Sequence, residues 1–173
     1  MRTDLIVVPD TLSTGWLSLG EHRFRCALGR SGVRTDKREG DGATPSARMK
    51  MRRVFYRPDR IASLVTALPS QALTPSDGWC DDPAAADYNR LIGLPHPARH
   101  ERLWRDDNIY DVIVELGWND EPVIAGNGSA IFLHVARENF TPTEGCVALA
   151  LGNLLTLLRV VPRNVALHIT AAP

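Results

Sequence analysis

The sequence lacks an excess of charge of either sign and any long apolar run. Twenty Lys and Arg residues balance twenty Asp and Glu residues, so no global field draws the protein to nucleic acid or to an anionic membrane. The first apolar run, residues 5–8, ends at Pro9 and is too short for a secretory signal or a membrane span. We expect a cytoplasmic protein without membrane insertion or a nucleic-acid partner; a trimmed N-terminus would instead allow the periplasm or cell envelope.

Cysteine is also scarce, and its spacing excludes some kinds of site. Cys26, Cys80 and Cys146 cannot all pair within one chain, and they lie too far apart for a C-x-x-C zinc cluster. His96 and His100 have a spacing of four residues, but the prolines beside His96 disfavour a helix there and no third ligand is in view. We therefore expect at least one free thiol, no metal and no organic cofactor.

The composition is that of an ordinary globular chain, and the pattern of elements is mainly β. The 173 residues are 44% apolar and 23% charged, which suits a single domain over residues 1–173. We predict a hairpin at 16–28, a loop at 29–46, strands at 48–56, 110–116, 130–135 and 165–169, a proline-rich stretch at 69–97, and one helix near 149–160. Many short strands with one good helix predict a β-sandwich or barrel.

Two of the three cysteines have simple structural interpretations. Cys26 shares one face of the predicted hairpin with Phe24 and Leu28, which indicates a small core residue. Cys80 is followed directly by Asp81 and a second aspartate, whose charges would disfavour a thiolate. Cys146 is the remaining candidate for chemistry.

Cys146 and His134 form the most informative pair. His134 lies near the end of a short, almost wholly apolar stretch, and Cys146 follows twelve residues later, after Gly145 and just before the predicted helix. An imidazole can take the proton of a thiol, a helix N-terminus favours a thiolate, and backbone N–H groups there can hold an oxyanion. The alternative is a core cysteine and a buried histidine that donates to a carbonyl, and the residues alone leave both open.

Two motifs resemble one known family. Residues 128–134 end in His134, and residues 143–148, Thr-Glu-Gly-Cys-Val-Ala, follow; together they resemble the catalytic signature of the YkuD-type L,D-transpeptidases. Residues 37–46 resemble that family's upstream Asp-Gly-x-Thr-Pro loop. The resemblance covers about residues 15–170, and it implies a mainly β catalytic domain whose main helix follows the catalytic cysteine.

The resemblance also implies an activity and a set of roles. Cys146 would attack the carbonyl before the terminal D-alanine of a peptidoglycan tetrapeptide stem, after a diaminopimelate-type residue. His134 would be base and then acid, and the N–H groups of Gly145 and Cys146 would bind the oxyanion. The thioester would pass to water, as in an L,D-carboxypeptidase, or to an amine, as in a crosslinking transpeptidase. The implied partners are stem peptides or muropeptides, and the oligomeric state stays open.

Some positions depart from the family pattern. Glu144 stands where the family usually has His, Ala148 where many members have Arg, and the loop from His134 to Cys146 is short. Thr143 occupies the family's Ser/Thr position, where a hydroxyl can brace the loop or His134. These departures motivate a second hypothesis of another class, a catalytically silent peptide-binding module.

Hydrolysis during recycling is the favoured outcome. Three cysteines suit a reducing compartment, and the stems available inside a cell are released fragments surrounded by water. We expect an L,D-carboxypeptidase of muropeptide recycling, with crosslinking as the alternative.

Further residues are candidates for substrate binding. Trp79 can form the wall of a groove, Arg90 can pair with a carboxylate, and Glu144 lies in the signature itself. Asn127, Thr143 or a backbone carbonyl can orient the far nitrogen of His134. The basic run of residues 48–60 can meet anionic groups or RNA, although a solvated strand face is the simpler interpretation.

Overall fold

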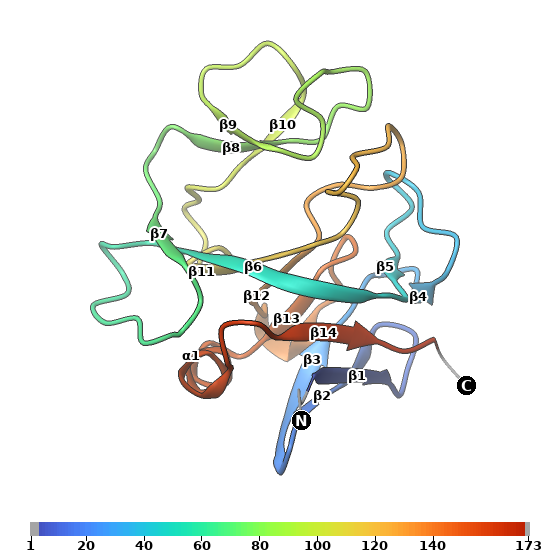
Figure 1. The fold of residues 1–173 in the computed structure, drawn as a ribbon, viewed down its shortest axis with the longest axis vertical. Coiled ribbons are helices and arrows are strands. Elements are labelled where there is room, and N and C mark those ends of the chain that lie inside the picture. The colour runs from blue at the N-terminus through green and yellow to red at the C-terminus, as the bar shows by residue number, and fades with distance from the viewer. Residues whose placement is uncertain (1–3, 172–173) are drawn as a thin grey trace.

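The computed structural model describes residues 4–171, so residues 1–3 and 172–173, the ends of the predicted single domain, lie outside the description (Figure 1). Short strands dominate the chain, as the sequence predicts. The elements are β1 (Leu5–Pro9), β2 (Thr14–Leu19), β3 (His22–Ala27), β4 (Val33–Arg34), β5 (Thr44–Pro45), β6 (Arg48–Tyr56), β7 (Ser70–Ala72), β8 (Asp77–Cys80), β9 (Leu91–Gly93), β10 (His100–Arg102), β11 (Val112–Leu116), β12 (Phe132–Val135), the 3₁₀ turn η1 (Glu138–Phe140), β13 (Val147–Leu149), α1 (Leu151–Val160) and β14 (Ala166–Ile169).

The main sheet closes into a barrel. Its nine strands run in the order β11-β12-β13-β3-β2-β1-β14-β6-β7, and β11 also pairs with β6. The pairs β1–β14, β12–β13 and β6–β7 are parallel, and the other neighbours are antiparallel. Alternating apolar side chains fill the interior, including Leu5, Leu17, Leu133 and Leu167. The prediction of a mainly β fold with one helix is confirmed.

The predicted hairpin forms between β2 and β3 and places Cys26 in the core. Leu17 pairs with Phe24 across the hairpin, and the turn begins at Gly20 with a φ of 57°, which glycine adopts without steric cost. Cys26 is 0% exposed, and burial raises the pKa of its thiol to about 12. The core interpretation of Cys26 is therefore confirmed.

The helix α1 begins too far along the chain from Cys146 to activate its thiol. α1 starts at Leu151 and packs Leu154, Leu157 and Leu158 inward. The three-residue strand β13 lies between Cys146 and this helix. The helix follows Cys146 as predicted, but the expected activation of the thiol by the helix N-terminus is not supported, because the residues directly after Cys146 pair with β12 and β3.

A small sheet stands beside the barrel and supplies a second core. β8 lies between β10 and β9 in the segment from β7 to β11, at the top of Figure 1. The sequence predicted only a proline-rich stretch here, because three- and four-residue strands give no clear periodicity. The second core lies where this sheet meets the barrel, and its buried members are Phe55, Leu73, Trp79, Leu103, Ile109, Tyr110, Ile113, Ala130, Phe132 and Cys146.

The predicted loop at 29–46 contains one short pair of strands, β4 and β5, which join in parallel. Gly29 also forms a bridge to Thr143, and Leu28 O accepts the Thr143 N–H at 2.9 Å. The loop therefore packs against the segment that precedes Cys146.

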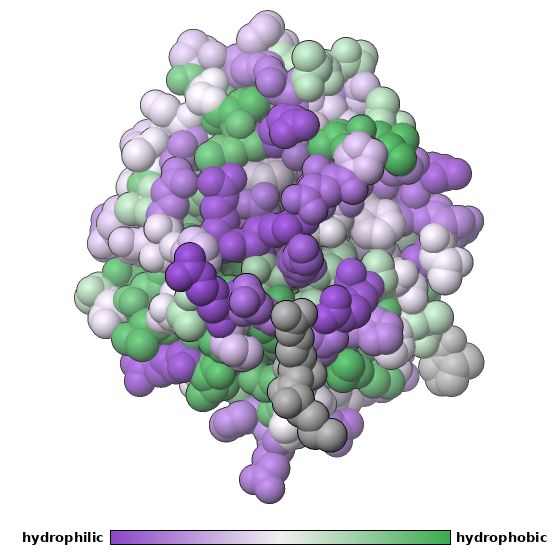
Figure 2. Space-filling model, in the orientation of Figure 1, coloured by the Kyte–Doolittle hydropathy of each residue, from purple (hydrophilic) through white to green (hydrophobic). Residues whose placement is uncertain are grey.

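Five arginines of β6 and the residues after it pair with acidic neighbours. Ion pairs join Arg48 to Asp4, Arg52 to Asp120 and Glu121, Arg53 to Glu115, Arg57 to Asp59, and Arg60 to Asp111. Figure 2 shows hydrophilic side chains across the middle of this face, at the level of β6. This pairing supports a solvated strand face. Between residues 4 and 171, no helix has the length and apolar character needed to cross a membrane.

Candidate active site

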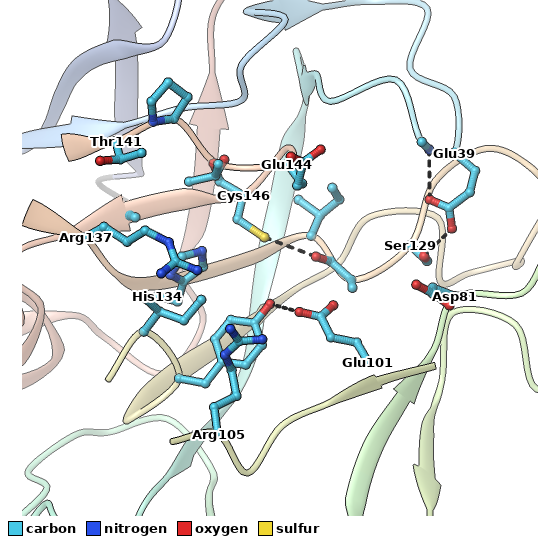
Figure 3. A pocket seen from close by; sticks show the side chains of 18 of the residues that line it. Glu39, Asp81, Glu101, Arg105, Ser129, His134, Arg137, Thr141, Glu144 and Cys146 are labelled. Atoms are coloured by element: carbon cyan, nitrogen blue, oxygen red, sulfur yellow. Dashed lines mark hydrogen bonds between the residues drawn. The ribbon is translucent and has the colours of Figure 1, made fainter. Parts of the chain in front are cut away.

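Two neighbouring strands bring the predicted catalytic pair into one cavity. β12 and β13 pair in parallel with His134 opposite Ala148, and Cys146 lies just before β13. The cavity measures about 490 Å³, and both His134 and Cys146 line it (Figure 3). His134 is 5% exposed and Cys146 is 8% exposed, so substrate would meet both groups in a largely dry site.

The Cys146 thiol is protonated at rest. Its Sγ donates to the Ala130 carbonyl at 3.2 Å and accepts the Phe132 N–H at 3.4 Å. Burial raises the pKa of this thiol to about 12, and the negative charge of Glu101 acts in the same direction. A preformed thiolate is thus disfavoured, contrary to the expectation based on a helix dipole.

His134 is also neutral at rest, and its tautomer is determined by one contact. Nδ1 lies 2.9 Å from the backbone carbonyl of Val135, so it carries the proton and leaves the Nε2 lone pair available as a base. Burial, together with the charges of Arg137 and Arg105, lowers the pKa of His134 to about 4. Of the three orienting groups considered, the backbone carbonyl makes the contact.

Thr143 braces the loop that carries the cysteine. Its Oγ1 donates to the Cys146 carbonyl at 2.7 Å and accepts the Gly145 N–H at 3.1 Å. In the resting structure the Gly145 N–H is donated to Thr143, so it could bind an oxyanion only after this contact opens. The oxyanion roles of the Gly145 and Cys146 N–H groups stay predictions.

Gly145 is required by a close approach of two backbone segments. Its φ is 136°, and a Cβ at this position would lie 2.7 Å from the Ala43 carbonyl oxygen. Ala43 belongs to the Asp-Gly-x-Thr-Pro loop, whose Asp41 accepts the N–H groups of Arg38 and Ala43 and pairs with buried Lys37. The two motifs of the resemblance thus touch each other directly.

The two residues that depart from the family pattern, Glu144 and Ala148, lie at different depths. The Glu144 side chain is 80% exposed and pairs with Arg30 at 2.9 Å, at the rim of the cavity. Ala148 is buried at 1% and lines the cavity next to His134. The small side chain of Ala148 leaves space where many family members carry Arg.

Three of the predicted substrate-binding residues lie outside this cavity. Trp79 is 4% exposed, packs edge-on against Phe132 at a ring distance of 5.1 Å, and lines a different cavity together with Arg90. Asn127 accepts from Arg38 at 3.2 Å and does not line the Cys146 cavity. Their expected contact with substrate is not supported by this placement, because packing places Trp79 under Phe132 rather than beside Cys146.

Asn89 was missed as a candidate, although it connects the small sheet to the Cys146 cavity. Its buried Oδ1 accepts the Trp79 Nε1–H at 3.0 Å and the Ala130 N–H at 3.1 Å. Its Nδ2 donates to the Trp118 and Asn119 carbonyls. Ala130 has a φ of 53°, so Asn89 helps to hold a strained residue whose carbonyl accepts the Cys146 thiol.

Other cavity residues also lacked a sequence signal. The Tyr110 hydroxyl donates to Glu101, and the Tyr110 ring packs edge-on against His134 with centroids 5.3 Å apart. Burial raises the pKa of the Glu101 carboxyl. Arg105 and Arg137 complete this side (Figure 3). Glu101, Arg105, Tyr110 and Arg137 come together only in the folded structure, so no spacing rule along the chain would predict their grouping.

The two remaining predictions concern metal binding and Cys80. His96 lies 3.1 Å from Asp87, whereas His100 contacts the Ala98 carbonyl, so the two histidines have separate partners. No group of three or more His, Cys, Asp or Glu in the described part of the chain is arranged to hold a metal ion. Cys80 is 0% exposed, and its burial keeps it from solvent.

The fold and the site together define a β-barrel domain with a buried cysteine and a buried histidine in one cavity. The family model of the L,D-transpeptidase catalytic domain, YkuD, matches residues 6–169. The chain therefore belongs to the YkuD family, and this membership supports cysteine-dependent acyl transfer on peptidoglycan. No curated protein and no solved structure gave a match.

Proposed function

We propose that this protein is an L,D-carboxypeptidase that removes the terminal D-alanine from tetrapeptide stems through a thioester on Cys146. The observation that carries the proposal is the shared cavity of Cys146 and His134, with His134 Nδ1 engaged by Val135 O. This contact leaves Nε2 as the only ring nitrogen able to accept the thiol proton. Neither residue would have this use without the other.

The resting geometry supports a mechanism of general-base catalysis over one that begins from a thiolate–imidazolium ion pair. The thiol first leaves the Ala130 carbonyl, because its hydrogen bond points there in the resting state. His134 Nε2 then takes the proton as Sγ attacks the carbonyl carbon, and the Cys146 N–H stabilises the oxyanion. The same imidazole returns the proton to the leaving amine, and water hydrolyses the thioester by the reverse sequence.

Hydrolysis of released stem fragments fits the cysteine chemistry of the chain. All three cysteines are free and buried, and free thiols persist in a reducing compartment such as the cytoplasm. Stems found there are fragments released from the wall, and water greatly outnumbers acceptor amines. We therefore propose a role in muropeptide recycling, with crosslink formation as the competing outcome of the same acyl-enzyme.

The test is incubation with a purified disaccharide-tetrapeptide, with and without a second stem, followed by mass spectrometry. Loss of one alanine without dimer formation is the expected result. Efficient dimer formation at modest acceptor concentration would replace hydrolysis by transpeptidation. Absence of both products, together with binding of the stem, would favour the silent peptide-binding module and overturn the proposal.

A further inference from the structure

The cavity has walls of opposite charge on either side of Cys146. Arg105 and Arg137 lie on the side of His134, and Glu39 and Asp81 lie on the other side, beyond the Ala130 carbonyl (Figure 3). Glu39 accepts a hydrogen bond from Ser129, and Asp81 pairs with Arg99. A substrate carboxylate is repelled by the acidic wall and attracted by the basic wall, so the cavity can orient a charged substrate.

The basic wall holds two guanidinium groups, and the carboxylate that pairs with both is that of Asp107. Glu101, whose carboxyl pKa burial raises, also lies near Arg105 and accepts the Tyr110 hydroxyl. Arg105 contacts both oxygens of Asp107, at 2.8 and 2.7 Å, whereas Arg137 reaches the same carboxylate at only 3.4 Å. One carboxylate thus serves two guanidinium groups. The Arg137 side chain is 47% exposed, so most of its N–H donors are open to a ligand.

The chemistry of the reaction decides which part of the substrate meets this wall. The group that protonates the leaving amine lies beside that amine, so the leaving residue occupies the side of His134. The α-carboxylate of a terminal residue is separated from its own amine by a single carbon, which places it near Arg137 and Arg105. Ala148, opposite His134 in the strand register, leaves the space for it.

We propose that Arg137, supported by Arg105, binds the free α-carboxylate of the leaving residue and thereby selects stems that end one residue after the scissile bond. This inference rests on the proposed carboxypeptidase function and adds the substrate group that confers exopeptidase specificity. Arg137 in this way supplies the positive charge that position 148 does not carry in this chain. A guanidinium fits a carboxylate with two parallel hydrogen bonds, which a neutral amide cannot reproduce.

The test compares a tetrapeptide stem with its C-terminal amide in the wild-type protein and in variants of Arg137. We expect wild type to favour the acid, and Arg137→Gln to lower kcat/KM for the acid by about tenfold while leaving the amide within about twofold. The loss should appear mainly in KM, because the carboxylate is bound in both ground and transition states. Arg137→Lys should restore part of the preference for the acid. Arg159→Gln, on the exposed side of α1, should leave kcat/KM unchanged for both substrates.

The outcomes separate this inference from the proposed function. Equal rates for acid and amide in wild type, or an equal loss of both in Arg137→Gln, would overturn the role of Arg137 while the carboxypeptidase stands. If the wild-type protein releases neither alanine from the acid nor alaninamide from the amide, the carboxypeptidase itself is overturned, and the inference with it.

Discussion

The barrel and the small sheet contribute different kinds of group to the same cavity. The barrel supplies Cys146 and His134 from strands packed in an apolar interior, and both groups are neutral at rest. The small sheet and the segment that returns from it supply polar and charged groups such as Asn89, Glu101 and Arg105. The barrel thus holds the two groups that we propose to react, whereas the small sheet contributes their polar surroundings.

The junction between the two regions explains why Cys146 and His134 are both uncharged. Cys146 belongs to the second core, where Trp79 and Tyr110 pack on Phe132 and keep water away. Removal of water raises the pKa of a thiol and lowers that of an imidazole, so the ion pair is disfavoured until a substrate arrives. In the proposed mechanism, the proton moves from the thiol to the imidazole only when the developing oxyanion and the new carbon–sulfur bond compensate for the cost of charge separation.

Removing either reacting group should give the largest effect. Cys146→Ala and His134→Ala should each lower turnover by about 10⁴-fold or more, since a thiol without its base and a base without its thiol are both inactive. Alanine release measured by mass spectrometry checks the rate, and thermal unfolding checks that the variants stay folded. Cys80→Ala, which changes a buried cysteine of the small sheet, should keep most of the activity. Wild-type rates in Cys146→Ala or His134→Ala would move the chemistry out of the barrel.

Alkylation with iodoacetamide should show the second largest effect. Burial raises the pKa of Cys146 to about 12, so the reactive thiolate should increase about tenfold for each pH unit between pH 7 and 9. Peptide mapping should find Cys146 modified first, because it lines the cavity whereas Cys26 and Cys80 are 0% exposed. A Cys146 rate that is already constant above pH 7 would indicate a stable thiolate paired with His134.

The barrel could be predicted from the sequence because its elements have long enough patterns. The alternation in residues 22–28 predicted β3 and the core position of Cys26, and the spacing of Leu151, Leu154, Leu155 and Leu158 predicted α1. The predicted start of α1, near residue 149, comes two residues early because Leu149 fits a strand and a helix equally well. Only the partners β12 and β3 decide between them.

The small sheet could not be predicted because its contacts are long-range. Asn89 meets Ala130, and Glu101 meets Tyr110, through turns whose geometry no local periodicity describes. Arg90 looked suitable for a carboxylate by residue type, yet it lines another cavity, whereas Arg137 lies at the site. Residue type indicates what a side chain can bind, and only the fold decides which one faces the substrate.

Asn89→Ala should weaken the junction between the two regions. The change leaves the buried Trp79 Nε1–H and the Ala130 N–H without their acceptor, which should lower the free energy of unfolding by about 2–4 kcal/mol. Chemical denaturation measures the loss, and alanine release should also decrease because the Ala130 carbonyl no longer has a fixed position. Asn164→Ala, at an exposed site, should change stability by less than about 0.5 kcal/mol. Equal stability of the two variants would mean that the barrel positions Ala130 unaided.

Thr143→Val should give the smallest of these effects, because it alters a brace within the barrel's own loop and leaves both reacting groups in place. Valine keeps the shape but removes the oxygen that donates to the Cys146 carbonyl and accepts the Gly145 N–H. We expect kcat to decrease about tenfold, since two hydrogen bonds that hold the nucleophile are lost. Thr143→Ser should recover most of the rate, and Glu144→Gln, whose side chain is 80% exposed, should stay within about twofold of wild type. An increase of kcat in Thr143→Val would have a distinct meaning: the released Gly145 N–H would then serve as an oxyanion donor, and the contact with Thr143 would be a restraint on catalysis rather than a support.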